Sequence, residues 1–138
     1  MFKFCSLYSG STGNSLFVET DNTKVLVDTG ESCKKIVEGL SSINVSADEI
    51  DAIIITHEHI YHVKSLGTIS KKFNIPVYAN TETWDAMPTQ RDKIETHNIK
   101  TFKIKESFEI GDLRIKPFSI PHDAANPCGF KICHNNKK

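Results

Sequence analysis

Hydrophobic positions divide the chain into short segments, some alternating with polar residues as in strands and others spaced as on one face of a helix. Residues 52–55 form an apolar run, Ala-Ile-Ile-Ile, that is typical of a strand buried on both faces. Polar residues occupy 56–62, and residues 63–73 then carry apolar side chains at three- and four-residue spacings. A buried strand that passes through a polar cluster into a helix predicts α/β architecture with a site at the carboxyl end of the strand.

The same patterns predict the other elements of the chain. Strands are expected at residues 2–8, 15–20, 23–28, 75–79, 100–105 and 129–133, with two more within 108–120. Helices are expected at 32–40 and 81–87, a short helical turn after a capping box at 46–49, and a loop or frayed helix at 88–98. The sequence has no internal repeat or linker, so residues 1–138 are expected to form a single domain.

Composition excludes several classes of protein. Hydrophobic residues make up 38% of the chain and charged residues 25%, which suits a globular domain and argues against disorder. The 17 basic residues balance 17 acidic residues, so the chain has no net positive charge that would attract nucleic acid. A local basic patch could still form from lysines, or these could only be solvated helix faces; the candidates are Lys34, Lys35, Lys71 and Lys72.

The four cysteines and the apolar runs indicate the cellular compartment in which the protein is expected. Cys5, Cys33, Cys128 and Cys133 form no C-x-x-C pair, and Cys128 and Cys133 with His134 fit no standard zinc spacing. No apolar run approaches the roughly eighteen residues that a membrane-spanning helix needs. We therefore expect a cytoplasmic protein with reduced thiols and no membrane partner.

Three histidines follow the apolar run within six residues. His57 and His59 lie two positions apart, so on an extended backbone they face the same way and could share one ion. His62 lies at the start of the expected helix. Imidazole is the commonest metal ligand and binds in its neutral form. The alternative is a polar loop whose histidines cap a helix, but the H-x-H-x-x-H cluster after a buried strand favours metal binding.

These motifs resemble a known family. Residues 56–62, THEHIYH, are similar to the H-x-H-x-D-H signature of the metallo-β-lactamase superfamily, whose members are metal-dependent hydrolases with an αββα sandwich fold. The segments 9–15, 25–30 and 121–125 resemble the YycJ/WalJ-like branch, which implies phosphodiesterase or DNA exonuclease activity. The resemblance implies an α/β (α+β) chain that covers roughly the first half of the sandwich and is incomplete at its C-terminus.

The resemblance also implies a set of site residues. His57, His59 and His122 would bind a first metal ion, and His62 would hold a second ion weakly. Asp28 would orient a ligand histidine through a hydrogen bond, and Asp123 would either do the same or serve only as a turn residue. The cofactor implied is Zn²⁺ or Mn²⁺, with one ion per chain. The glycine-containing loop at 9–15 could form an anion-binding nest or only a tight turn, and the resemblance favours a loop that lines the site.

One residue departs from the family signature. Tyr61 occupies the position of the aspartate that in the family binds the second metal and activates water. A phenol is a poor general base at neutral pH and a poor substitute for a carboxylate ligand. Three hypotheses follow: a metal-dependent hydrolase of nucleic acid or another phosphodiester with reduced activity, an inactive truncated homologue that acts as a binding or structural module, and a homodimer of two half-domains.

Overall fold

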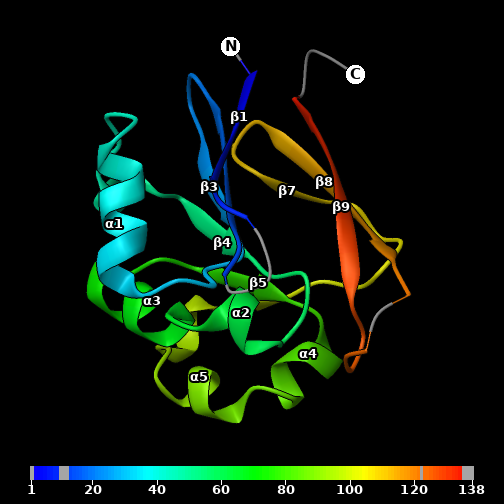
Figure 1. Ribbon diagram of the computed structural model, residues 1–138. Helices are drawn as coiled ribbons and strands as arrows, with labels where there is room; N and C mark the ends of the chain where they lie inside the picture. The colour runs from blue at the N-terminus through cyan, green and yellow to red at the C-terminus, as the bar shows by residue number, and fades with distance from the viewer. Residues whose placement is uncertain (1, 10–12, 122, 135–138) are drawn as a thin grey trace.

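The computed structural model describes residues 2–9, 13–121 and 123–134, and it places them in three layers (Figure 1). A six-stranded sheet forms the middle layer, with strands in the order β1-β2-β3-β4-β5-β6. Its strands are β1 (Phe2–Tyr8), β2 (Ser15–Thr20), β3 (Lys24–Val27), β4 (Ala52–Ile54), β5 (Val77–Ala79) and β6 (Ile99–Thr101). The first three strands are antiparallel to one another, whereas β3, β4, β5 and β6 are parallel.

Helices cover one face of this sheet. They are α1 (Cys33–Ser41), α2 (Ile60–Val63), α3 (Leu66–Phe73), α4 (Thr81–Asp85) and α5 (Pro88–Asp92), with 3₁₀ turns η1 (Ala47–Glu49) and η2 (Thr96–Asn98). Ile36 and Leu40 of α1 pack with Ile53 of β4 in the core on this side of the sheet. Burial of these apolar side chains is the main force that holds the helices to the sheet.

A three-stranded antiparallel sheet covers the other face. It consists of β7 (Phe108–Ile110), β8 (Leu113–Ser119) and β9 (Cys128–His134). Leu113 and Ile115 of β8 are fully buried against Val25 and Ile54 of the first sheet. Helices, first sheet and second sheet are therefore three consecutive layers of an αββα sandwich, which confirms the expected fold class.

The buried strand at 52–55 and the helix that contains Trp84 were predicted correctly. The single helix predicted for residues 63–73 was not. Ala52–Ile54 is buried as expected, and Trp84 of α4 is only 2% exposed. The helix expected over 63–73 is instead two helices that meet at Ser65. The Ser65 N–H donates to the carbonyl of Thr29 at 3.1 Å, so a contact with a distant loop replaces the helical hydrogen bond.

Three further expectations differ from the structure. Residues 88–98 contain α5 and η2, and Pro88 stands at the first position of α5, where its fixed φ and missing N–H suit a helix start. The strand expected at 100–105 ends at Thr101. Ser46 makes no capping bond to the η1 backbone, because its hydroxyl donates to the side chain of Asp48 instead.

The two sheets each leave one flank open at the same side of the molecule. In the described part of the chain, β1 bonds only to β2 and β9 only to β8. An apolar cavity of about 210 Å³ lies between these strands, lined by Phe4, Leu16, Val27, Thr56, Phe130 and Ile132. Phe4 is 54% exposed at its mouth. Among the described residues no helix has the length and apolar character required to cross a membrane.

At the far end of β3, a carboxylate joins the two sheets. Asp112, in the turn between β7 and β8, accepts hydrogen bonds from the hydroxyls of Thr20 and Thr23, both at 2.7 Å. Its other oxygen lies 2.9 Å from Nε2 of His134 on β9. The hydrogen bond from Thr23, with those from the other partners, holds the pKa of Asp112 well below its usual range. Gly111 has φ +56°, and a Cβ there would lie 2.1 Å from the Thr23 hydroxyl, so this close approach requires glycine.

Candidate metal centre

The parallel pairing of β3 and β4 brings the polar residues that follow them together. Val27 is in register with Ile54, so Asp28 and Thr56 leave the sheet at the same edge. The N–H of Asp28 donates to the carbonyl of Ile54 at 2.9 Å. Asp28 has φ 66°, a left-handed conformation that aspartate tolerates better than branched residues do. The end of the sheet therefore fixes the direction of this carboxylate.

Asp28 binds both the strand end and a histidine. Its Oδ1 accepts from the Thr56 N–H at 2.9 Å, and its Oδ2 accepts from the Thr56 hydroxyl at 2.7 Å. The same Oδ2 lies 2.7 Å from Nδ1 of His62. Asp28 is only 4% exposed. With Nδ1 facing the carboxylate, the ring orientation of His62 is fixed, as in carboxylate–histidine–metal arrangements.

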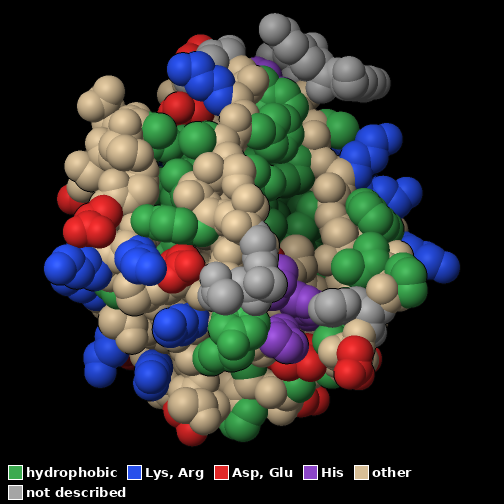
Figure 2. Space-filling model, viewed as in Figure 1, with side chains coloured by type: hydrophobic (Ala, Val, Ile, Leu, Met, Phe, Trp, Pro, Cys, Tyr) green, Lys and Arg blue, Asp and Glu red, His purple; other side chains and the backbone are tan. Residues whose placement is uncertain are grey.

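The three motif histidines lie together at this edge. The ring of His57, which is 3% exposed, meets the ring of His62 edge-on with centroids 4.0 Å apart. The ring of His59 lies 6.1 Å from that of His57 and is exposed. Figure 2 shows histidine side chains gathered at one point of the surface. The sequence motif is thus a spatial cluster, with one member buried and another open to solvent.

The donor set fits a metal ion in part. His57 and His59 provide two neighbouring imidazoles, and His62 is held by a carboxylate, as a ligand histidine would be. Within residues 2–9, 13–121 and 123–134, no three His, Cys, Asp or Glu side chains are placed to hold an ion. The expected third ligand, His122, lies outside the described residues.

Residues 10–12 of the glycine-containing loop lie outside the described residues, but Asn14, just before β2, contacts the histidine cluster. The N–H of Asn14 donates to the carbonyl of Tyr61 at 2.9 Å, and its Nδ2 lies 3.3 Å from Nε2 of His62. Gly30 donates to the carbonyl of Asn14, and a Cβ at Gly30 would lie 1.7 Å from the Tyr61 carbonyl. Only glycine therefore permits this close packing of the three segments. The sequence indicated this loop through its glycines but did not single out Asn14.

Tyr61 lies at the rim of the cluster. Its side chain is 39% exposed, and its ring lies 5.4 Å from the ring of His59. Ile60 beside it is 50% exposed. The position that carries a carboxylate in the family signature therefore carries an aromatic ring beside a candidate ligand.

Glu58 links the motif to the segment that follows β8. Its Oε2 accepts from the N–H of Ala125 at 3.0 Å, while its Oε1 is buried and has no hydrogen-bond partner among the described residues. Two more contacts hold this segment: Asn80 Nδ2 donates to the carbonyl of Asn126 at 2.9 Å, and the Cys128 N–H donates to the carbonyl of Thr56 at 2.9 Å. Residues 125–128 are thus held against Glu58, Asn80 and Thr56, next to the histidine motif. Glu58, between the two histidines, was missed because its partner is 67 residues away.

The remaining sequence candidates lie elsewhere or have other roles. Asp123 is exposed, so its role as a histidine partner remains a prediction. Cys128 is fully buried, and burial, with the charge of Asp28, raises the pKa of its thiol to about 12. Cys133 faces away from Cys128 on β9, and His134 bonds to Asp112. His97 is exposed and contacts Asn74 at 3.1 Å, as expected of a surface histidine.

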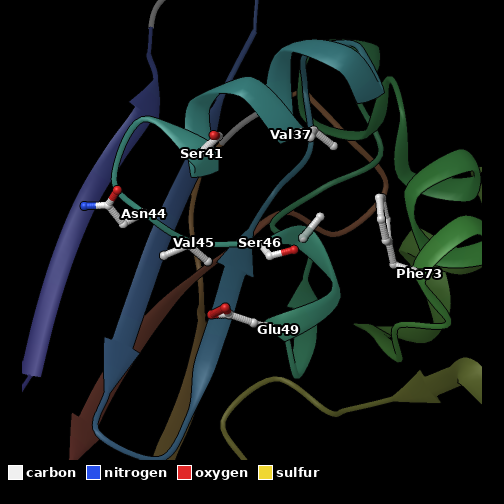
Figure 3. Close-up of a pocket in the computed structure, with 8 residues that line it drawn as sticks. Val37, Ser41, Asn44, Val45, Ser46, Glu49 and Phe73 are labelled. Atoms are coloured by element: carbon white, nitrogen blue, oxygen red, sulfur yellow. The ribbon is translucent and has the colours of Figure 1, made fainter.

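A pocket of about 450 Å³ opens on the helical side, away from the histidines (Figure 3). It lies between α1, η1 and the end of α3, and its lining residues are Val37, Ser41, Asn44, Val45, Ser46, Ala47, Glu49 and Phe73. Its one carboxylate, Glu49, lies 3.9 Å from the amine of Lys24. Its lining contains one carboxylate and no histidine or cysteine, so it does not provide a metal ligand set.

The chain is similar to known proteins in sequence and in fold. It is 38% identical to the exodeoxyribonuclease YycJ of Bacillus anthracis, over 98% of this chain and 51% of that protein. It is also 38% identical to the exodeoxyribonuclease WalJ of Streptococcus pneumoniae, over 99% of this chain and 51% of that protein. A solved metallo-β-lactamase from Cronobacter sakazakii superposes with a TM-score of 0.76 at 14% identity, over 91% of this chain and 50% of that one.

The chain thus spans about half the length of the curated relatives that it matches. The family model described as the metallo-beta-lactamase superfamily matches residues 8–136, which include the histidine motif, Asp28 and the second sheet. On these grounds the chain belongs to the metallo-β-lactamase superfamily.

Proposed function

We propose that this chain carries the metal-binding half of a hydrolase that cleaves phosphodiester bonds in nucleic acid. Two of the curated relatives are named exodeoxyribonucleases, and the chain aligns with about half of each. The observation that carries the proposal is the cluster of His57, His59 and His62 at the carboxyl ends of β3 and β4. That edge is where open α/β sheets bind their ligands.

In this proposal His57, His59 and His122 hold one Zn²⁺ or Mn²⁺ ion. A bound ion supplies Lewis acidity and lowers the pKa of its water. Asp28 holds Nδ1 of His62, so Nε2, which lies 3.3 Å from Nδ2 of Asn14, is the nitrogen left to bind an ion. Thr56 fixes Asp28 through two hydrogen bonds. Glu58 holds the segment after His122 against the motif through Ala125.

The first test is metal content. Purified protein is dialysed against Zn²⁺ or Mn²⁺, and the ions per chain are measured for the wild type and for His57→Ala. The surface variant His97→Ala is the control, since it removes an imidazole from outside the cluster. We expect about one ion per chain, lost in His57→Ala and kept in His97→Ala. Equal metal content in both variants would contradict the proposed site.

The second test is hydrolysis of bis-p-nitrophenyl phosphate and of labelled single-stranded DNA. Activity should require the metal, disappear with EDTA and be absent from His57→Ala. A folded, metal-loaded protein without turnover would favour the second candidate function, an inactive binding or structural module. Tyr61 at the position of the signature aspartate is the observation that favours this candidate.

We also propose a homodimer formed at the open flank. The unpaired edges of β1 and β9 and the apolar cavity between them, with Phe4 half-exposed, would be covered by the same flank of a second copy. Light scattering after size exclusion should give twice the monomer mass, and Phe4→Lys should give the monomer. A wild-type monomer would refute this arrangement. The free state of all four cysteines supports a cytoplasmic location.

A further inference from the structure

The outer face of the second sheet carries cations where a covered sheet face would carry apolar side chains. Along β8, Leu113, Ile115 and Pro117 are buried, whereas Arg114, Lys116 and Phe118 are exposed. On β9 the residues that share this outer face are Gly129, Lys131 and Cys133, opposite Phe118, Lys116 and Arg114 respectively. Figure 2 shows Lys and Arg side chains along the side of the molecule where β8 and β9 lie. This face is built to meet water or a polar partner.

Two like charges stand opposite each other on this face. Lys116 pairs with Lys131 across the strands, and like charges at directly opposed positions destabilise a sheet. Arg114 lies two residues before Lys116, on the same face, with Glu109 of β7 opposite it. Neither lysine nor Arg114 forms an ion pair with any described residue. Lys116 and Lys131 therefore carry positive charge with no carboxylate opposite them on β8 or β9, and an anionic partner would neutralise it.

An aromatic ring continues the row of cations. The ring of Phe118 lies against Gly129, since a Cβ built on Gly129 would stand 2.7 Å from Cζ of the ring. One side of the ring is thus supported by the backbone, and the side chain remains 47% exposed. A supported, exposed ring beside cations is the combination on which proteins stack bases of single-stranded nucleic acid.

The row leads toward the histidine cluster. Phe118 lies at the end of β8, next to Ser119, and Ser119 is in register with Cys128. The N–H of Cys128 donates to the carbonyl of Thr56, the residue before His57. From Arg114 to Phe118 the row covers about 14 Å, at roughly 3.4 Å per strand residue. Its aromatic end is thus its end nearest the candidate metal centre.

We propose that the outer face of β8 and β9 binds single-stranded nucleic acid, with phosphates on Arg114, Lys116 and Lys131 and a base on Phe118. This inference rests on the proposed function for its choice of polyanion, because the row would guide a strand toward the histidines. The binding itself needs neither metal nor hydrolysis, so it is tested independently of the catalytic proposal.

The test measures fluorescence anisotropy of a fluorescein-labelled oligothymidylate with metal-free protein in EDTA. The double variant Lys116→Gln/Lys131→Gln is compared with Lys34→Gln/Lys35→Gln, which removes two exposed charges from α1. We expect the β8–β9 variant to bind about tenfold more weakly at low salt. Its slope of log affinity against log salt should be shallower by about 1.4, or roughly 0.7 for each lost phosphate contact. The α1 variant should bind as the wild type does.

A second variant separates base stacking from simple charge attraction. Phe118→Ala should weaken oligothymidylate binding by about fivefold or more and leave the binding of heparin unchanged, because heparin has no bases. Thermal unfolding confirms that each variant is folded. Absence of wild-type binding, equal losses in the two double variants, or an unchanged oligothymidylate affinity in Phe118→Ala would each overturn the proposal.

Discussion

The carboxylate of Asp28 lies 2.7 Å from Nδ1 of His62, although 34 residues separate them in the sequence. The contact exists because β3 and β4 are parallel neighbours whose carboxyl ends coincide. Thr56 completes it by binding both carboxylate oxygens. Because Asp28 is fixed at the end of the sheet, its contact with His62 fixes the orientation of the imidazole ring.

Replacing this carboxylate should weaken metal binding. In Asp28→Asn the side chain keeps its size but loses the charge that holds Nδ1 of His62, so we expect the affinity for the second, weakly held Zn²⁺ ion at His62 to fall by about ten- to a hundredfold. Competition with a chromophoric chelator measures the affinity. Asp85→Asn, on the exposed surface of α4, is the control and should leave it unchanged. Identical affinities in both variants would mean that Asp28 serves only the fold.

Glu58 should act through the segment that it holds. Glu58→Ala removes the acceptor for the Ala125 N–H, so the segment next to His122 loses an anchor and Zn²⁺ affinity should fall by about tenfold. Glu58→Gln keeps an acceptor oxygen and should bind nearly as the wild type does. The matched control is Glu38→Ala on the exposed side of α1. An equal loss in the Gln and Ala variants would contradict an anchoring role.

Tyr61 should limit the number of ions. Tyr61→Asp introduces a hard carboxylate at the signature position, so metal content should rise from about one toward two ions per chain. The rate of bis-p-nitrophenyl phosphate hydrolysis should rise with it. Tyr61→Phe keeps the ring and should change neither quantity. Metal analysis and steady-state rates on the three proteins decide the matter, and a Tyr61→Asp protein that resembles Tyr61→Phe would refute the prediction.

Asp112 should stabilise the fold in a pH-dependent manner. Its pKa is lowered in the folded protein, so its stabilisation is fully present above the unfolded value of about 4 and is lost as pH falls below it. Asp112→Asn should therefore cost about 1–3 kcal/mol of unfolding free energy at pH 7. This difference from the wild type should shrink below pH 4. Urea titrations at several pH values measure it, with the exposed Asp92→Asn as a control that should show no such trend.

Cys128 should resist alkylation. Burial raises the pKa of its thiol to about 12, so at pH 8 the reactive thiolate is nearly absent, and the side chain has no exposed surface. Iodoacetamide followed by peptide mass spectrometry should modify Cys5 and Cys33, which are partly exposed, before Cys128. Unfolding in urea should abolish the difference. Equal labelling of Cys128 and the other cysteines in the native protein would contradict this prediction. It would mean that the second sheet separates from the first with little free-energy cost and exposes Cys128.

The sequence predicted the spatial clustering of His57, His59 and His62 better than the lengths of the surrounding helices and strands. The apolar run at 52–55 and the spacing of His57, His59 and His62 are local signals, and the parallel sheet places Asp28 beside them without further information. The helix break at Ser65 had no local signal, because the apolar spacing continues across it while Thr29 supplies the competing hydrogen bond.

The strand at 100–105 was overestimated for a similar reason. Its alternation continues to Lys105, but its partner β5 ends at Ala79, where Asn80 turns the chain by capping α4. Beyond Ala79, β5 offers no backbone groups with which the alternating residues could continue the sheet hydrogen bonds. Contacts such as Glu58 with Ala125 were beyond prediction, because nothing in either segment specifies the other.

The contact of Asp112 with Thr20, Thr23 and His134 lies at the start of β3, whereas the histidine cluster lies at its end. One end of the sandwich is therefore joined through an ionised carboxylate and the other through the neutral backbone bond of Cys128 to Thr56. Acid removes the charge of Asp112 and leaves the backbone bond of Cys128 unchanged. In native-state amide exchange at low pH, the amides of Thr23 and Asp112 should lose protection while that of Ile53 in β4 keeps it, so the two sheets separate from the end remote from the metal.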